Sequence, residues 1–334
     1  MNMYNNELRF SLWCDFVERS FLENEFSSLI EKKIVNAATS NPSIFKSAFL
    51  GSPAYKEAKA LLEGRPAKEI YETLAIQDIQ CAASKLLSAY EEDNDGFISI
   101  EVDPFLCDDA QATIEEGKRL YKAIGYPNVM IKVPATEAGF VAMEAFLSEG
   151  MHVNATLVFS HQQAKACLDA FARANALLES KSISKLPQAV ISIFVSRFDR
   201  KLDAKLETID FPTGRVGIMN ALRCYDVIEG HGLQNVRALF ASTGVKGDSL
   251  KEDYYIQELL VKNAINTAPL NTIHAFVSSN DELLPIEYTP EMIENFFNAL
   301  HANDIDINHV CDELMDEGLR AFKEAFVEIL NELK

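Results

Sequence analysis

The sequence predicts an α/β protein: a single (β/α)₈ barrel of the TIM type, with extra helices after the second strand and at the C-terminus. Short β-branched or aromatic runs alternate with longer segments of helical period, as in parallel sheets covered by helices. Eight such runs fit a closed barrel, which takes about 250 residues. The rest of the 334 residues falls in two helical blocks.

The predicted strands are short runs rich in Val, Ile, Ala and Phe that end in polar or turn-forming residues. They lie at 10–15, 34–39, 97–103, 128–134, 151–158, 188–195, 236–242 and 272–278. The segments that follow most of them have helical period. These lie at 68–90, 108–124, 137–148, 161–179, 197–207, 215–230 and 251–267.

Two helical segments are additional to this strand–helix alternation. Residues 43–95 hold several helices between the second and third strands, and residues 290–334 form a C-terminal helical extension that we expect to pack on the barrel. No linker interrupts the chain, so residues 1–334 are expected to form one domain. An open doubly wound sheet is the alternative, but no Gly-x-Gly-x-x-Gly follows a predicted strand, which disfavours its dinucleotide-binding version.

The charge limits the class of partner. The chain has 50 acidic and 31 basic residues and a net charge of −19. Nucleic acids and anionic membranes bind clustered Lys and Arg, so neither is expected as a partner. A small anionic substrate remains compatible, because a few local cations set the field of a pocket. The C-terminal helices leave a homodimer open.

The cysteines and the N-terminus indicate a cytoplasmic protein. The cysteines lie at 14, 81, 107, 167, 224 and 311, and no pair has Cys-x-x-Cys spacing. Such cysteines are typical of reduced core residues. The N-terminus has no signal pattern, and no apolar run reaches the roughly 18–20 residues of a membrane span.

One lysine stands in an otherwise apolar strand. Lys132 lies in the run Asn128-Val-Met-Ile-Lys-Val-Pro134, with five apolar neighbours. A charged ammonium is costly there, so the neutral amine becomes populated. A neutral buried amine attacks a ketone to form a Schiff base. The alternative is that Lys132 extends to solvent, for which its neighbours leave little room.

Other polar residues recur where predicted strands end, and barrel enzymes carry their active residues there. The set is Asp15, Asn41, Glu101, Asp103, Asn154, Thr156, Ser192, Arg197 and Ser242. Residues two apart in a strand share a face, so Asn154 and Thr156 are expected to point together, as are Ser192 and Phe194. With Lys132, the set predicts a site at one rim of the barrel.

Structural explanations exist for several of these residues. Asp15 and Asp103 could cap the segments that follow them. Asn154 and Thr156 could satisfy each other's hydrogen bonds inside a barrel. Because a single residue can be explained structurally, the prediction of a site depends on the whole set and not on any one member.

Two basic or titratable residues have similar alternatives. Arg197 could pair with Asp199 or Asp203 on a helix face. His152 shares the predicted face of Asn154, yet a lone histidine is more often a satisfied core group than a base or a ligand.

Six segments carry Lys132 and most of the polar residues at strand ends, in order along the chain. They are Thr39-Ser-Asn-Pro-Ser-Ile-Phe45, Ile98-Ser-Ile-Glu-Val-Asp103, Ile131-Lys-Val-Pro-Ala-Thr136, Asn154-Ala-Thr-Leu-Val-Phe-Ser160, Ser192-Ile-Phe-Val-Ser-Arg197 and Ala241-Ser-Thr-Gly-Val-Lys246. From about residue 9 to 280, the chain resembles the transaldolase family. The six segments together are specific, whereas the Asn-Pro element alone would be weak.

The resemblance implies a barrel of the class I aldolase kind that uses no metal and no organic cofactor. It implies transfer of a dihydroxyacetone unit through a lysine Schiff base, in the non-oxidative pentose phosphate pathway. Sedoheptulose 7-phosphate and glyceraldehyde 3-phosphate would exchange with erythrose 4-phosphate and fructose 6-phosphate. Sugar phosphates are therefore the expected partners.

The resemblance also implies roles for single residues. Lys132 would form the Schiff base. Glu101 would act as acid and base through a water held by Thr156, and Asp15 would take the proton of the C4 hydroxyl. The implied substrate-binding residues are Asn41, Asn154, Ser192, Phe194, Arg197 and Ser242, with Arg197 at the phosphate.

One position departs from the family pattern. Some transaldolases have a second phosphate-binding arginine two residues after the serine of the seventh strand, where this chain has Gly244. Lys246, four residues after Ser242, is the replacement we expect. A lysine is a point charge without the bidentate fork of arginine.

Two functional alternatives remain. An enzyme like the fructose 6-phosphate aldolases would release free dihydroxyacetone. Those enzymes resemble this chain but have glutamine at the position of Glu101 and tyrosine at that of Phe194, so both residues favour the transferase. A non-catalytic sugar-phosphate-binding barrel would have the pocket without a working amine.

Overall fold

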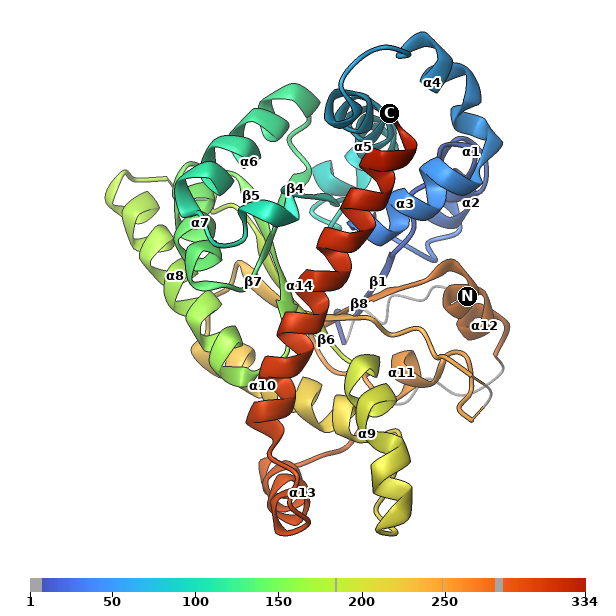
Figure 1. Cartoon of the computed structure of the whole chain (residues 1–334). Helices are drawn as coiled ribbons and strands as arrows, with labels where there is room; N and C mark the ends of the chain where they lie inside the picture. The colour runs from blue at the N-terminus through green and yellow to red at the C-terminus, as the bar shows by residue number, and fades with distance from the viewer. Residues whose placement is uncertain (1–7, 184, 248, 280–284) are drawn as a thin grey trace.

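The strands close into a parallel barrel (Figure 1). The computed structural model describes residues 8–183, 185–247, 249–279 and 285–334. Within these residues the strands are β1 (Ser11–Cys14), β2 (Ala37–Ala38), β3 (Ile98–Glu101), β4 (Val129–Pro134), β5 (His152–Val158), β6 (Ala189–Phe194), β7 (Val236–Ala241) and β8 (Ile265–Ala268). They follow in chain order round the barrel, and β8 pairs with β1. The predicted (β/α)₈ barrel is confirmed.

Helices surround the barrel, and the extra ones lie where the sequence predicts them. After β1 and β2 come α1 (Arg19–Glu23), α2 (Glu25–Glu31), α3 (Pro42–Gly51), α4 (Lys56–Leu61) and α5 (Ala67–Glu91). The middle of the chain adds α6 (Ala110–Ile124), α7 (Glu137–Ser148), α8 (His161–Ser180), α9 (Ser196–Thr208) and α10 (Val216–His231). The last are α11 (Tyr254–Gln257), α12 (Leu270–Ser278), α13 (Pro290–Ala302) and α14 (Ile307–Glu332).

Side-chain caps fix several helices at the end of the barrel where the strands finish. Asn41 accepts a hydrogen bond from Ile44 N at the start of α3, and Thr136 accepts one from Gly139 N at the start of α7. Ser160 begins α8 with a capping box. These caps hold the turns that follow β2, β4 and β5, and hence the residues that end those strands.

The last strand differs from the prediction. Residues 272–278 were expected as a strand and 251–267 as a helix, but 272–278 lie in α12, and 251–267 hold only short α11 and most of β8. Both predictions are wrong for a physical reason. Asn266 and Thr267 are buried inside β8, so this strand is too polar to stand out, whereas Ile273 and Phe276 are spaced to bury one face of α12.

A polar network closes the end of the barrel where the strands begin. Asp95 accepts hydrogen bonds from the Trp13 indole at 2.9 Å and from the Asn36 amide at 3.1 Å. Its other oxygen pairs with Arg237 at 2.7 Å, and Arg237 also donates to backbone carbonyls near β1 and β8. Because this end is closed by structural contacts, chemistry belongs to the opposite end.

The C-terminal helix α14 lies over that opposite end. It contacts α3, α5, β5 and α9, and Figure 1 shows it in red, running from α13 towards α5. Gly318 permits this close approach. A Cβ at position 318 would lie 2.9 Å from Leu157 Cδ2 and 3.3 Å from Arg197 Nη1.

Candidate active site

A small cavity of about 120 Å³ opens where the strands end. It is lined by Asp15, Thr39, Asn41, Ser43, Lys132, Ser192, Phe194, Arg197, Ala241, Ser242, Thr267 and Phe322. The structure thus brings together seven of the predicted site residues. Glu101, Asn154 and Thr156 are buried in the strands β3 and β5 that flank β4, and only Lys246 is exposed away from the lining.

Strand register places the lysine between two predicted partners. Lys132 on β4 pairs in register with Glu101 on β3 and with Asn154 on β5. Its side chain is buried, with 4% of the residue exposed. Nζ donates to the Ser40 carbonyl at 3.0 Å and lies 3.7 Å from Glu101 Oε2. The amine is therefore held inside the barrel, and the alternative that it extends to solvent is wrong.

Glu101 is a buried carboxylate with unused acceptor capacity. Burial raises its pKa from 4.5 to about 7, although the nearby Lys132 charge opposes the rise. Neither carboxylate oxygen of Glu101 nor the Thr156 hydroxyl has a hydrogen-bond partner within the described ranges. Unpaired buried polar atoms are costly, and here they lie beside the amine. A carboxyl that titrates near 7 is suited to both give and take a proton.

Asp15 supplies a second carboxylate in a different environment. It follows β1, lines the cavity and accepts a 2.6 Å hydrogen bond from the Thr39 hydroxyl. Thr39 in turn lies 2.7 Å from the Thr267 hydroxyl. Burial raises the pKa of Asp15, against the effects of the Lys132 charge and the Thr39 hydrogen bond. Asp15 does not cap α1, because Glu18 does.

A chain of polar side chains crosses the floor of the site. Asn154 donates to the Ser99 hydroxyl at 3.0 Å and accepts from the Ser192 hydroxyl at 2.7 Å. Asn154 and Thr156 therefore do not satisfy each other, and that alternative is wrong. The chain fixes the Asn154 amide and leaves Ser192 on the cavity wall.

Arg197 contributes a guanidinium to the cavity lining. It is half-buried at the start of α9, and its guanidinium carbon lies 5.0 Å from the centre of the Phe194 ring. The alternative that it pairs with Asp199 or Asp203 is wrong, since no ion pair joins them in the part of the chain that the structure describes. Burial, together with the Arg200 charge, lowers the pKa of Arg197 to about 10.

The loop after β7 places the last two predicted residues differently. Ser242 lines the cavity and has a left-handed backbone with φ of 55°, a conformation that is uncommon outside glycine and clusters at functional sites. Lys246 is exposed and does not line the cavity.

Two other predicted alternatives are confirmed as structural roles. Asp103 caps the short 3₁₀ helix that follows it and pairs with Lys68 at 2.6 Å. His152 accepts a hydrogen bond from Gln188 N at 2.8 Å and lies 3.1 Å from the Tyr90 hydroxyl, so it is a satisfied core group. Burial lowers its pKa to about 4.

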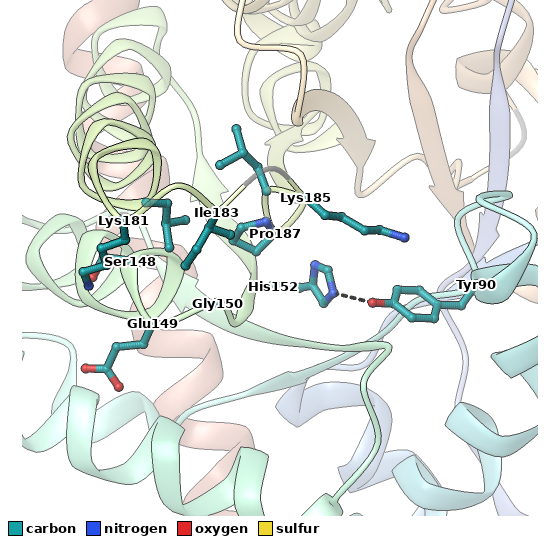
Figure 2. A pocket seen from close by; sticks show the side chains of 11 residues that line it. Tyr90, Ser148, Glu149, Gly150, His152, Lys181, Ile183, Lys185 and Pro187 are labelled. Atoms are coloured by element: carbon teal, nitrogen blue, oxygen red, sulfur yellow. Dashed lines mark hydrogen bonds between the residues drawn. The ribbon is translucent and has the colours of Figure 1, made fainter.

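A larger cavity of about 530 Å³ lies where β5 begins (Figure 2). Figure 2 shows Tyr90 and His152 joined by a hydrogen bond, with Lys181 and Lys185 nearby. None of the predicted site residues lines it. Its size alone does not make it the active site, because the candidate nucleophile and both carboxylates are elsewhere.

Sequence reasoning missed several residues of the site. Thr39 and Ser40 lie in the segment 39–45 and directly follow a strand, so their position at a strand end could have identified them. Thr267 was missed because β8 was misplaced. Phe322 comes from the middle of α14, and no local pattern distinguishes it from an ordinary core residue.

Among the described residues, no group of His, Cys, Asp and Glu side chains is arranged to hold a metal ion. No described helix combines the length and apolar character needed to span a membrane.

A closed α/β barrel with a buried lysine and two carboxylates at its mouth defines a barrel enzyme of the lysine-dependent aldolase class. Comparison with known proteins agrees. The family profile "Transaldolase/Fructose-6-phosphate aldolase" matches residues 12–333. A transaldolase of Campylobacter jejuni subsp. doylei is 47% identical over 333 residues, 97% of this chain and 99% of that protein. A transaldolase of Helicobacter pylori (strain Shi470) is 46% identical over 325 residues, 96% of this chain and 98% of its own.

This chain belongs to the transaldolase/fructose-6-phosphate aldolase family. The match covers the barrel and both carboxyl-terminal helices. The prediction of a transaldolase enzyme is confirmed.

Proposed function

We propose that the enzyme transfers a dihydroxyacetone unit from sedoheptulose 7-phosphate to glyceraldehyde 3-phosphate, giving erythrose 4-phosphate and fructose 6-phosphate. The observation that carries the proposal is the Lys132 amine, buried inside the barrel and 3.7 Å from a carboxylate that titrates near 7. The single-domain chain would act in the cytoplasm, in the non-oxidative pentose phosphate pathway. Six unpaired cysteines support that compartment.

Schiff-base formation uses Lys132 and Glu101. The amine attacks the keto carbon of the donor, and the carbinolamine then loses water to give the imine. This loss needs a proton delivered to the leaving hydroxyl. Glu101 would deliver it, either directly or through a water held by the Thr156 hydroxyl. The unpaired oxygens of both side chains support this assignment.

Carbon–carbon cleavage uses Asp15. It removes the proton of the C4 hydroxyl, the C3–C4 bond breaks, and its electron pair moves into the imine to form an enamine. The aldehyde product leaves. Asp15 lines the cavity, and the raised pKa of its carboxyl makes it a stronger base than a solvated aspartate. Two carboxylates in different surroundings thus divide two proton transfers.

Retention of the three-carbon fragment separates a transferase from an aldolase. Asn154 and Ser192, joined by a 2.7 Å hydrogen bond, would hold the hydroxyls of the fragment. Asn41 would add a contact, although its side-chain oxygen already caps α3. Phe194 and Ser242 form the neighbouring wall. Arg197, with Lys246 as the cation expected from sequence, would bind the phosphate.

The closest functional alternative is an aldolase that releases free dihydroxyacetone. Acceptor dependence distinguishes the two. We expect consumption of fructose 6-phosphate to rise at least about tenfold when erythrose 4-phosphate is added, with ping-pong kinetics, because the covalent fragment waits for an acceptor. The measurement is the initial rate with and without acceptor. Equal rates, with free dihydroxyacetone accumulating, would support the aldolase.

A further inference from the structure

Two arginines near the start of α9 have no carboxylate partner. Arg197 and Arg200 are three positions apart, so they lie on neighbouring parts of one helix face. Arg197 lines the cavity, whereas Arg200 is exposed. Across residues 8–334 as far as they are described, neither guanidinium makes a hydrogen bond or ion pair, and Arg197 only stacks over Phe194.

The carboxylates of α9 and α14 that lie near them are engaged elsewhere. Figure 1 shows α9 beside the lower part of α14, and the α14 carboxylates Glu313 and Glu317 pair with Lys201 at 3.0 and 2.7 Å. Asp199 accepts from a backbone N–H of α10 at 3.0 Å and from a tyrosine hydroxyl of α11 at 2.8 Å. Asp203 accepts from the Gly214 N–H at 3.0 Å.

Two unpaired guanidiniums one helical turn apart, of which Arg197 lines the cavity, repel each other in a chain with a net charge of −19. Burial and the Arg200 charge lower the pKa of Arg197, and burial lowers that of Arg200. A dianion held between them would offset both the repulsion between the two guanidiniums and the cost of burying their charges. Guanidinium forks match the oxygens of a phosphate, and the amino end of α9 adds a favourable dipole.

We propose that Arg200 is a second phosphate ligand, which together with Arg197 binds the phosphate end of the sugar. The inference rests on the proposed function and makes it more specific. It places the second cation on α9, whereas the sequence suggested Lys246 in the loop after β7. That loop has Gly244 at the expected arginine position. Neither Lys246 nor Arg200 is in the cavity lining, but Arg200 lies one helical turn from Arg197, which does line the cavity. Selectivity for phosphorylated over free sugars is then set by one helix.

The test compares a phosphorylated with an unphosphorylated donor. Borohydride trapping of the lysine adduct is measured against the concentration of fructose 6-phosphate and of fructose. For Arg200→Ala we expect the half-saturating concentration of fructose 6-phosphate to rise about tenfold, the loss of a charge-assisted contact, with fructose unchanged within about twofold. Arg197→Ala should behave similarly, and Arg200→Lys should recover part of the effect. Inorganic phosphate should compete with fructose 6-phosphate less well in Arg200→Ala.

Lys205→Ala is the matched control, because it removes one exposed cation from the same helix at a position further from Arg197. It should leave both donors within about twofold of wild type. An equal loss in Lys205→Ala, or no phosphate-specific loss in Arg200→Ala, overturns the inference. A phosphate-specific loss in Lys246→Ala alone assigns the role to Lys246. If fructose is trapped in every variant, the Schiff-base proposal stands whatever the result for phosphate. If neither sugar is trapped by the wild-type enzyme, the Schiff-base proposal is wrong.

Discussion

Replacing Lys132 with Ala is expected to lower kcat/KM for dihydroxyacetone transfer by at least about 10⁴-fold. In the proposed mechanism the reaction passes through a covalent bond to this amine, and among the residues that the structure describes no second lysine lines the cavity. The remaining groups can bind the sugar but cannot form the imine that accepts the electron pair of the broken bond. The measurement is the steady-state rate of transfer from fructose 6-phosphate to erythrose 4-phosphate.

The control for this variant is its folding. Lys132 donates to the Ser40 carbonyl and neighbours Glu101, so its removal leaves a buried carboxylate without a nearby cation. Circular dichroism and thermal unfolding should show a folded barrel at pH 5.5, where Glu101 is mostly protonated. A folded variant with activity within tenfold of wild type would exclude Lys132 as the nucleophile.

Replacing Glu101 with Gln is expected to lower kcat by about 10²–10⁴-fold, the usual contribution of a positioned acid–base group. Gln keeps the shape of the side chain but cannot exchange a proton with the carbinolamine. Because the pKa of Glu101 is raised to about 7, the wild-type rate should show an ionisation near pH 7 that disappears in the variant. A profile with the same ionisation in Glu101→Gln would assign it to another group.

Glu101→Gln, which is expected to lower activity, is expected to raise the stability of the fold above neutral pH. The pKa of Glu101 is raised in the folded state, from 4.5 to about 7, so its protonated form favours folding. That contribution is fully present below pH 4.5 and is lost as pH rises through 7. Glu101→Gln should therefore melt higher than wild type at pH 8 and nearly equal to it at pH 4.5. Exposed Glu115→Gln is the control and should show no such difference.

These effects follow because the polar groups of the site make folding less favourable in free energy than an apolar core would. A buried amine, a buried carboxylate and an unpaired hydroxyl lie within one end of the barrel. Such groups are retained where catalysis needs shifted pKa values and free acceptors. Activity and stability should thus change in opposite directions at Glu101.

The barrel itself was largely predictable from the sequence. Seven of the eight strands lie where an apolar run predicted them, and a segment of helical period follows most of these runs. This alternation specifies a parallel sheet. The eighth was not predictable in this way, because Asn266 and Thr267 make the interior of β8 polar. The apolar pattern of α12 then resembled the missing strand.

The site was predictable where residues come from strands. A period of two places Lys132 inside the barrel, and polar residues at strand ends indicate the active end. Strand register, which sets Lys132 beside Glu101, is a long-range property and had to come from the structure. Phe322 was also out of reach, since its helix lies far along the chain.

Phosphate binding shows a third limit. Sequence spacing offered Asp199 and Asp203 as partners of Arg197, but both carboxylates are used to hold neighbouring segments. Only the folded chain shows that Arg197 and Arg200 are left without an ion pair to a described carboxylate. A charge count along a helix cannot predict this outcome, because tertiary contacts compete for the same carboxylates.

The most direct measurement is borohydride reduction with fructose 6-phosphate, followed by mass mapping of the peptides. A reductively trapped three-carbon adduct should appear on the peptide that contains Lys132 and be absent from Lys132→Ala. An unmodified wild-type protein, or an adduct carried by a different lysine, would contradict the account.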